Sequence, residues 1–216
     1  MQPIGILGGT FDPVHIGHLR AALEVRDALG LAQVRMVPAN IPPHRPQPTA
    51  SAVQRVAMLR LATRGASGLA VDERELQRQG PSYTVDTLAD LRAQLGRRPI
   101  CLLVGDDAFR ALPAWHRWQE LFELAHLVVV QRPPVVGGRP GPDLPPDLTR
   151  ELKGRYAESV PALAATPAGL VWRQAIPALD ISATRIRAAL RARHSARFLV
   201  TDSCLRYIRR HHLYTD

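Results

Sequence analysis

The stretch that decides the fold is PIGILGGTFDPVHIGHL, residues 3–19. It begins as a short apolar run of the kind that forms a buried β-strand, and it then passes through two adjacent glycines. Ile16, Leu19 and Leu23 follow at helical spacing, and Gly30 ends the pattern. The sequence therefore predicts a strand, a glycine turn (residues 8–15) and a helix that runs from Ile16 to about Gly30.

The alternation of strand and helix continues along the chain. Short apolar runs predict further strands at residues 33–39, 69–73, 100–107, 126–132 and 170–176. Apolar residues at helical spacing predict helices at residues 53–62, 82–95, 183–192 and 202–211. This order favours an α/β fold: a Rossmann-like, doubly wound parallel sheet with a helical C-terminal portion. We expect one domain over residues 1–216, with residues 133–147, rich in Pro and Gly, as an irregular surface loop.

Composition narrows the class of protein. The chain is 46% hydrophobic, which allows a buried core, and its apolar runs are too short to cross a bilayer. Its first residues lack the basic start and long apolar run of a secretory signal. Cys101 and Cys204 are the only cysteines, which excludes a disulfide framework and a cysteine-based zinc cluster. We therefore expect a cytoplasmic protein.

The formal charge of +9 is carried by arginine, because Lys153 is the only lysine. Residues 173–216 hold nine arginines against three aspartates, a surplus of six positive charges. Such a region can attract a nucleic acid or an anionic small molecule equally well, and it can also be a solvated helix face. Charge alone leaves these alternatives open.

The glycine turn has the features of a phosphate site. Ligands of parallel α/β proteins bind beyond the carboxyl ends of strands, and Gly8 and Gly9 let the backbone approach a ligand. The helix that follows offers unpaired N–H groups, and His15 and His18 can donate hydrogen bonds to phosphate oxygens. A metal site is less favoured because no third Cys or His follows nearby. A purely structural pair of histidines leaves the glycines unexplained, and the spacing matches neither a Walker loop nor the dinucleotide fingerprint.

Several stretches resemble one enzyme family. GTFDPVHIGH, residues 9–18, resembles the (T/H)xGH signature of the nucleotidylyltransferase superfamily, which includes the class I aminoacyl-tRNA synthetases. ISATRIR, residues 181–187, resembles the ISSTxIR phosphate motif of the same superfamily. Further blocks resemble those of the bacterial nicotinate-nucleotide adenylyltransferases: PPHR (42–45), PSYTVDTL (81–88), VGDD (104–107) and LPAWHRWQELFELAHLVVVQRP (112–133). The resemblance covers nearly the whole chain.

The resemblance implies transfer of AMP from ATP to nicotinate mononucleotide, which gives nicotinate adenine dinucleotide and pyrophosphate in NAD biosynthesis. The phosphate of the mononucleotide would attack the α-phosphorus of ATP in line, with no covalent enzyme intermediate. A phosphate dianion needs no general base, so the protein's tasks are positioning and charge neutralisation. ATP and nicotinate mononucleotide are then the partners, with no nucleic acid and no membrane. Mg²⁺ is expected to be bound mainly through the ATP phosphates, with no metal site on the protein and NAD not a cofactor.

The motif matches assign residues to three groups. The catalytic group is His15, His18 and Arg187, with His18 as the donor to the charge that develops on the α-phosphate. The residues expected to bind ATP are Gly8, Gly9, Thr10, Phe11, His44, Arg45, Gly105, Asp107, Ile181, Ser182 and Thr184. Nicotinate mononucleotide is expected to be held by Thr84 and by backbone groups at Trp115 and His116.

Some of these residues have structural alternatives. Arg187 could be a surface charge and Thr84 a helix cap, while Trp118 is assigned to core packing. One of Asp106 and Asp107 could cap the turn that follows the strand.

Three positions depart from the family pattern. Arg45 stands where the family has lysine, Ala183 stands for a serine of ISSTxIR, and His116 stands at a position that is often tyrosine-like. None of these removes a group on which the expected chemistry depends, although they put side-chain contacts in question.

Other functions remain open. Related adenylyltransferases that act on nicotinamide mononucleotide or phosphopantetheine share the first motif, but a phosphopantetheine enzyme should be shorter and lack the 81–88 and 112–118 blocks. A class I synthetase would need a lysine-rich second signature, which a chain with one lysine lacks. A basic nucleic-acid-binding module fits the charge. It leaves the histidine motif unexplained, and aromatic residues make up only 5% of the chain.

Overall fold

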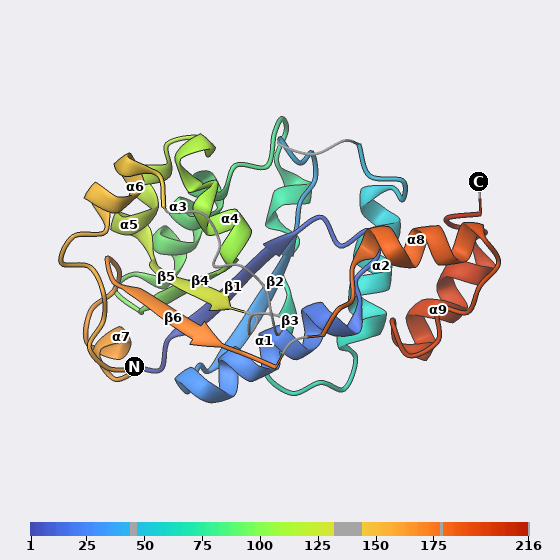
Figure 1. The fold of residues 1–216 in the computed structure, drawn as a ribbon, viewed down its shortest axis with the longest axis horizontal. Helices are drawn as coiled ribbons and strands as arrows, with labels where there is room; N and C mark the ends of the chain where they lie inside the picture. The colour runs from blue at the N-terminus through green and yellow to red at the C-terminus, as the bar shows by residue number, and fades with distance from the viewer. Residues whose placement is uncertain (44–46, 132–143, 178, 216) are drawn as a thin grey trace. The chain divides into compact units, whose positions relative to one another are not determined.

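The computed structural model describes residues 1–43, 47–131, 144–177 and 179–215 (Figure 1). Its strands are β1 (Ile4–Gly9), β2 (Gln33–Pro38), β3 (Leu69–Val71), β4 (Ile100–Gly105), β5 (His126–Gln131) and β6 (Val171–Ala175). Its α-helices are α1 (Ile16–Leu29), α2 (Ala52–Thr63), α3 (Thr84–Leu95), α4 (Asp106–Arg110), α5 (Leu121–Leu124), α6 (Pro146–Glu151), α7 (Ala162–Ala165), α8 (Ala183–Arg191) and α9 (Asp202–Arg210). The strands and longer helices predicted from the sequence are confirmed, with bounds shifted by at most two residues.

The strands form one parallel sheet in the order β3-β2-β1-β4-β5-β6. This is the order of a doubly wound Rossmann-like sheet, in which the direction of winding reverses between β1 and β4. β1 pairs in parallel with β4, and Ile6 lies opposite Leu102 in that pairing. The predicted fold class is therefore confirmed.

The chain divides into two compact units by its internal contacts. The first unit contains Met1–Leu7, Glu24–Val34 and Tyr83–Ala178, and the second contains Gly8–Leu23, Arg35–Ser82 and Leu179–Asp216. The expectation that residues 1–216 form one domain stays a prediction.

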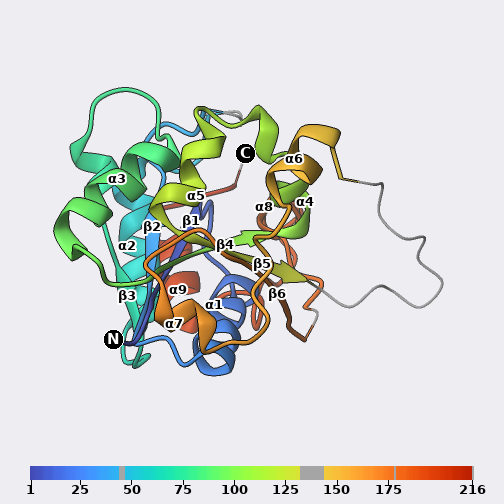
Figure 2. The ribbon, with the colours of Figure 1, turned by 90° about the vertical axis from the view of Figure 1, so that its left-hand side faces the viewer.

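The core of the first unit is built on β4 and β5. Figure 2 shows β4, β5 and β6 side by side, and the pairing of β4 with β5 and of β5 with β6 is parallel. Residues 101–104 are at most 4% exposed, and residues 127–129 are completely buried. Strands that are covered on both faces carry continuous apolar runs rather than alternating ones, and residues 100–104 and 127–130 form such runs.

Arg92 connects α3 by hydrogen bonds to three other segments of the first unit. The guanidinium of Arg92, on α3, donates to the carbonyl oxygens of Gly96 and Arg98 at 2.7 and 2.8 Å. It also donates to the carbonyl oxygens of Leu124 and Pro167 at 2.6 and 2.8 Å. Burial lowers the pKa of Arg92, but four carbonyl partners keep the charged form well solvated by protein.

Three helices of the second unit begin at side-chain caps. Ser51, Ser182 and Thr201 precede α2, α8 and α9, and each side-chain oxygen accepts from the backbone N–H three residues later. Such a cap satisfies one of the N–H groups that a helix start leaves without a partner. It also places each helix start at a defined residue, which matters for α8 because it carries the second motif.

The predicted loop at residues 133–147 needs a correction at its end. Residues 132–143 lie outside the described ranges, but Pro146 and Asp147 belong to α6. A proline is compatible with the first turn of a helix, because the N–H that it lacks would have no partner there. Helices as short as α4 to α7 were not predicted, since they span too few residues to show a helical period.

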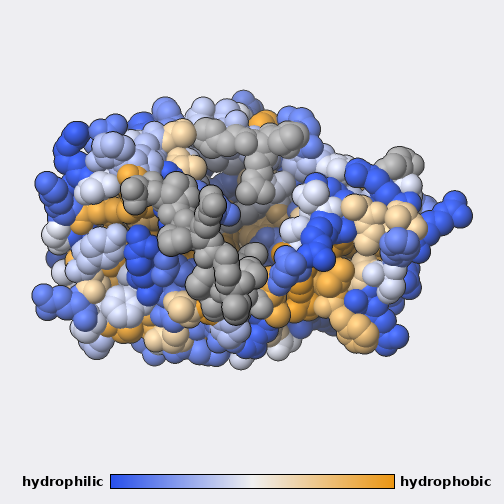
Figure 3. Space-filling model, in the orientation of Figure 1, coloured by the Kyte–Doolittle hydropathy of each residue, from blue (hydrophilic) through white to orange (hydrophobic). Residues whose placement is uncertain are grey.

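The described surface is mainly hydrophilic on the face drawn in Figure 3, where blue residues surround smaller hydrophobic areas. Among the residues described, no helix is long and apolar enough to cross a membrane.

The bonds of Arg92 generate a stability prediction. Replacing Arg92 with methionine removes the donors of four carbonyl oxygens, so we expect a loss of about 3 kcal/mol and a fall in Tm of roughly 6–12 °C. Thermal denaturation followed by circular dichroism measures it. The matched control is Arg97→Met, because Arg97 is an exposed arginine of the adjacent turn. Equal melting temperatures for the two variants would contradict the role assigned to Arg92.

Candidate active site

Two histidines stack at the start of α1. The rings of His15 and His18 lie 3.6 Å apart between centroids and 23° from parallel. The backbone N–H of His15 donates to Nδ1 of His18 at 3.3 Å. A ring nitrogen that accepts a hydrogen bond carries no proton, so the neutral imidazole of His18 has its proton on Nε2. His18 therefore presents a donor at Nε2, as a phosphate-binding histidine requires.

The packing of these rings explains two glycines of the motif. A Cβ at Gly17 would lie 3.0 Å from Nδ1 of His15, and a Cβ at Gly9 would lie 3.0 Å from the ring of Phe11. The Phe11 ring in turn meets the ring of His18 edge-on at 5.1 Å. Phe11 itself has φ of 51°, a left-handed conformation that is rare for a bulky residue and often marks a functional turn. By contrast, apart from its chain neighbours, no atom of the described residues lies within 4 Å of a Cβ built on Gly8, so these residues leave that position open to a ligand.

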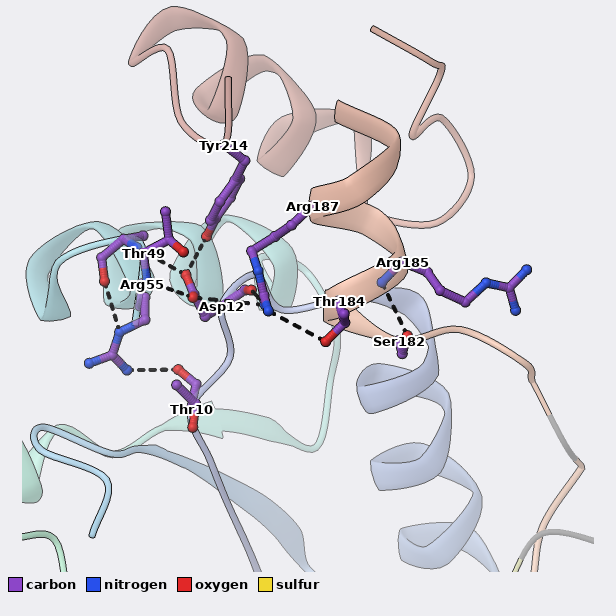
Figure 4. Close-up of polar contacts among 10 residues, drawn as sticks. Thr10, Asp12, Thr49, Arg55, Ser182, Thr184, Arg185, Arg187 and Tyr214 are labelled. Atoms are coloured by element: carbon purple, nitrogen blue, oxygen red, sulfur yellow. Dashed lines mark hydrogen bonds and ion pairs between the residues drawn. The ribbon is translucent and has the colours of Figure 1, made fainter. Parts of the chain in front are cut away.

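Asp12 is the central residue of the glycine turn (Figure 4). Its side chain is buried, and its two oxygens accept from the backbone N–H of Thr49 at 2.9 Å and of Ala50 at 3.1 Å. The Tyr214 hydroxyl donates to the same carboxylate at 2.7 Å. Three neutral donors thus hold one buried carboxylate, and with it the turn that leads to His15.

A buried arginine fixes the other side of this turn. Arg55, on α2, is only 1% exposed. It donates to the backbone carbonyl oxygens of Thr10 at 2.7 Å, Asn40 at 3.2 Å and Ala50 at 3.3 Å. Burial lowers the pKa of Arg55, while the nearby charge of Asp12 acts in the opposite direction. The geometry of the glycine turn therefore depends on two buried charges rather than on apolar packing alone.

The second sequence motif meets the first within this unit. Nη1 of Arg187, on α8, donates to the backbone carbonyl oxygen of Asp12 at 2.7 Å, across 175 positions of sequence. Its Nη2 donates to the Thr184 hydroxyl at 3.4 Å. Nη1 also lies 3.9 Å from the Asp12 carboxylate, which is an ion pair without a hydrogen bond. Arg187 is thus held at the glycine turn and is not a free surface charge.

A small pocket lies at the start of α8. Its walls combine apolar side chains with polar ones, namely Asp180, Ile181, Ser182, Arg185, Ile186 and Leu199. Arg185 pairs with Asp180, so the exposed charge at this helix start is partly balanced. Ser182 is the cap of α8, which explains why the helix tolerates Ala183 in the place of the family's serine.

The remaining predicted residues that the structure describes belong to the first unit. Gly105 and Asp107 are exposed at the carboxyl end of β4, while Asp106 pairs with Arg110 at 2.7 Å. The ring of His116 packs against that of Tyr83 at 4.3 Å.

Two alternatives for residues of the first unit can be judged from the structure. Thr84 is the first residue of α3 and not its cap, since the cap position is Tyr83. The ring of Trp118 meets that of Phe122 at 6.3 Å, as expected for packing.

His44 and Arg45 lie outside the described residues. Asp12 is not among the residues that sequence reasoning assigns to the site, and neither are Arg55 and Tyr214. Helical spacing counts Val53 among the apolar positions of α2, yet Val53 is 74% exposed, whereas Arg55 is buried. Periodicity alone carries no signal for a buried arginine.

Among the described residues, no group of three or more His, Cys, Asp or Glu side chains is placed to hold a metal ion. The Asp12 carboxylate is already occupied by hydrogen-bond donors, as described above. These residues suit a site that meets phosphates through nitrogen donors.

Comparison with known proteins identifies the family. Residues 6–189 match the model of the family described as cytidylyltransferase-like. A protein of Aeromonas hydrophila subsp. hydrophila, named "Probable nicotinate-nucleotide adenylyltransferase", is 49% identical over 98% of this chain and 97% of its own. A protein of the same name from Methylococcus capsulatus is 49% identical over 98% of this chain and 99% of its own. The nicotinic acid mononucleotide adenylyltransferase of Plasmodium falciparum, solved with NaAD, has a TM-score of 0.71 at 15% identity, over 99% of this chain and 98% of that one.

The fold and the match define a nucleotidyltransferase of the cytidylyltransferase-like class. Within that class the chain belongs to the nicotinate-nucleotide adenylyltransferase family, as the identity over nearly its full length shows.

The contact at Gly17 generates a prediction about activity. Gly17→Ala puts a methyl group against the His15 ring, so the stacked histidines must shift. We expect kcat to fall roughly ten- to hundred-fold, because small displacements of catalytic groups are costly. Tm should stay within a few degrees, since alanine is the better helix former. Pyrophosphate release and thermal denaturation measure the two effects, and a kcat within twofold of wild type would show that the rings tolerate the methyl group.

Proposed function

We propose that this enzyme transfers AMP from ATP to nicotinate mononucleotide, giving nicotinate adenine dinucleotide and pyrophosphate in NAD biosynthesis. The single observation that carries the proposal is the bond of Arg187 to the glycine turn, because it gathers both phosphate motifs at one place. The names of the full-length relatives support the choice of nicotinate mononucleotide as the acceptor.

The proposed reaction requires the enzyme to position its substrates and to neutralise phosphate charge. His18 donates from Nε2 to the oxygen of the α-phosphate on which charge develops, and His15 holds the neighbouring ATP phosphates. Arg187, with the N–H groups at the start of α8, neutralises phosphate charge. No side chain removes a proton, because the attacking phosphate is already ionised.

The rest of the ATP site is assigned by motif and accessibility. The backbone of Gly8, Gly9, Thr10 and Phe11 lines the phosphates, and the open face at Gly8 supports this role. Ser182 and Thr184 add contacts at α8, while the apolar wall at Ile181 suits a purine base. His44 and Arg45 reach the triphosphate, and Gly105 with the exposed Asp107 binds the ribose.

We propose that Mg²⁺ binds as a complex with ATP and not at a metal site of the protein. Divalent magnesium is commonly held by phosphate oxygens and water, with few protein ligands. The carboxylate of the glycine turn, Asp12, already accepts three hydrogen bonds. When bound to ATP, the ion supplies charge neutralisation on the phosphates.

The nicotinate ring and its carboxylate are assigned to Thr84 and the backbone at Trp115 and His116. The N–H of Trp115 already donates to the carbonyl oxygen of Leu112 at 2.8 Å. We therefore assign the carboxylate to the N–H of His116, since backbone N–H groups can bind an anion without a basic side chain.

A cytoplasmic location remains our proposal, and both cysteines are buried, free thiols.

The proposal is tested by offering the enzyme ATP and Mg²⁺ with one acceptor at a time. We expect rapid pyrophosphate release with nicotinate mononucleotide and a much lower kcat/KM with nicotinamide mononucleotide. Phosphopantetheine should give no signal. Release only with phosphopantetheine would overturn the assignment, and retention on DNA with no release at all would favour a nucleic-acid-binding protein.

Removing the His18 side chain tests the assigned chemistry. His18→Ala should lower kcat by ~10²–10³, which is the usual cost of one preorganised donor to a transition-state charge. The melting temperature should change little, because His18 is only partly buried. The control is His194→Ala, an exposed histidine beyond α8 that should leave kcat within twofold. A His18→Ala enzyme with near-normal turnover is incompatible with the proposed role.

A further inference from the structure

We propose that Tyr214 is a positioning residue for ATP: its hydroxyl holds the Asp12 carboxylate so that the charge of Arg187 stays available to phosphate. The inference rests on the proposed function, because it takes Arg187 to be a phosphate ligand. Tyr214 follows α9 and lies outside both sequence motifs, so nothing in the motif assignments includes it.

The contact between Tyr214 and Asp12 is buried on both sides. Tyr214 is 3% exposed and Asp12 is 6% exposed, and the hydroxyl lies 2.7 Å from Oδ1. Burial, followed by the bond to Asp12, raises the pKa of the Tyr214 hydroxyl. The hydroxyl therefore stays protonated at any pH at which the enzyme works, and it remains a neutral donor to the carboxylate.

The neutral donors to Asp12 determine how closely its carboxylate pairs with the guanidinium of Arg187. Oδ1 accepts from Tyr214 and from the N–H of Ala50, and Oδ2 accepts from the N–H of Thr49. Nη1 of Arg187 lies 3.9 Å from Oδ2 and bonds to the backbone carbonyl oxygen of Asp12 instead. A closer, charge-assisted pair between Asp12 and Arg187 would neutralise the guanidinium. By binding the carboxylate, the neutral donors keep it from forming this closer ion pair with Arg187.

Loss of the Tyr214 hydroxyl favours the closer ion pair between Asp12 and Arg187. Without Tyr214 the Oδ1 atom keeps only the donor from Ala50, and a buried carboxylate short of a donor favours the nearest cation. Among the described residues, Arg187 and Arg55 are the two arginines whose charge faces Asp12. Arg55 is already bound to three carbonyl oxygens, so Arg187 is the guanidinium that can turn. Its pairing with Asp12 would weaken ATP binding and leave binding of the acceptor unchanged.

The experiment compares Tyr214→Phe with Tyr207→Phe. The first removes only the hydroxyl that meets Asp12, and the second removes the hydroxyl of a half-buried tyrosine on α9 whose ring packs on His211. Isothermal titration with Mg²⁺ and α,β-methylene-ATP gives Kd, and steady-state kinetics give KM for each substrate. We expect Tyr214→Phe to raise both the Kd of the analogue and the KM for ATP about tenfold, with KM for nicotinate mononucleotide within twofold. Tyr207→Phe should change none of them. An unchanged Kd in Tyr214→Phe would overturn the proposal.

Two further readouts separate positioning from stability. Titration reports the number of binding sites apart from Kd, so partial unfolding lowers the first and lost positioning raises the second. In an Arg187→Gln background, Tyr214→Phe should have no further effect on Kd, because the group on which it acts is gone. A full additional loss in that background would show that the hydroxyl acts independently of Arg187 and would refute the mechanism. Wild-type protein that binds the analogue but transfers nothing to nicotinate mononucleotide would overturn the proposed function alone, and the Kd comparison would still decide the role of Tyr214.

Discussion

A buried carboxylate whose hydrogen-bond donors, among the described residues, are all neutral organises the second unit of this protein. Asp12 binds two backbone N–H groups and the Tyr214 hydroxyl, while its own backbone carbonyl receives Arg187. A buried charge is tolerable only when its hydrogen-bonding capacity is filled. The hydrogen bonds of the Asp12 side chain and backbone connect the glycine turn to the residues before α2, to the helix α8 and to the turn after α9, which are far apart in the sequence.

In the function that we propose, the site meets anions with fixed nitrogen donors. His18 has its proton on Nε2 because Nδ1 accepts a hydrogen bond. By our inference, the charge of Arg187 stays available to phosphate because the Asp12 carboxylate accepts its hydrogen bonds from other donors. Such donors need no reorganisation when phosphate charge moves during a reaction, which is the main source of catalysis in a displacement that forms no covalent enzyme intermediate. With Arg187 and His18 in these roles, stability and catalysis depend on the same buried network.

Sequence reasoning found the elements that repeat a pattern and missed those that depend on one contact. The strands β4 and β5 could be predicted because burial on both faces leaves an unbroken apolar run. The two phosphate motifs could be predicted because glycine and histidine at this fixed spacing are rarely explained by a purely structural role. The bond from Tyr214 to Asp12 leaves no local trace, since it joins residues 202 positions apart. Arg55 is hidden for a related reason: helical spacing marks a charged residue as exposed, and only the three carbonyl partners explain its burial. The reason for Gly17 also needed the structure, because its neighbour is the ring of His15.

The central claim is that the acceptor phosphate attacks the α-phosphorus of ATP directly, with the protein supplying position and charge only. The stereochemical course at that phosphorus tests it most directly. ATP made chiral at the α-phosphorus, with sulfur and oxygen isotopes, would be converted with nicotinate mononucleotide and the product's configuration read by ³¹P nuclear magnetic resonance. A single in-line displacement predicts inversion of configuration. Retention would require two displacements through an adenylylated side chain and would contradict direct transfer.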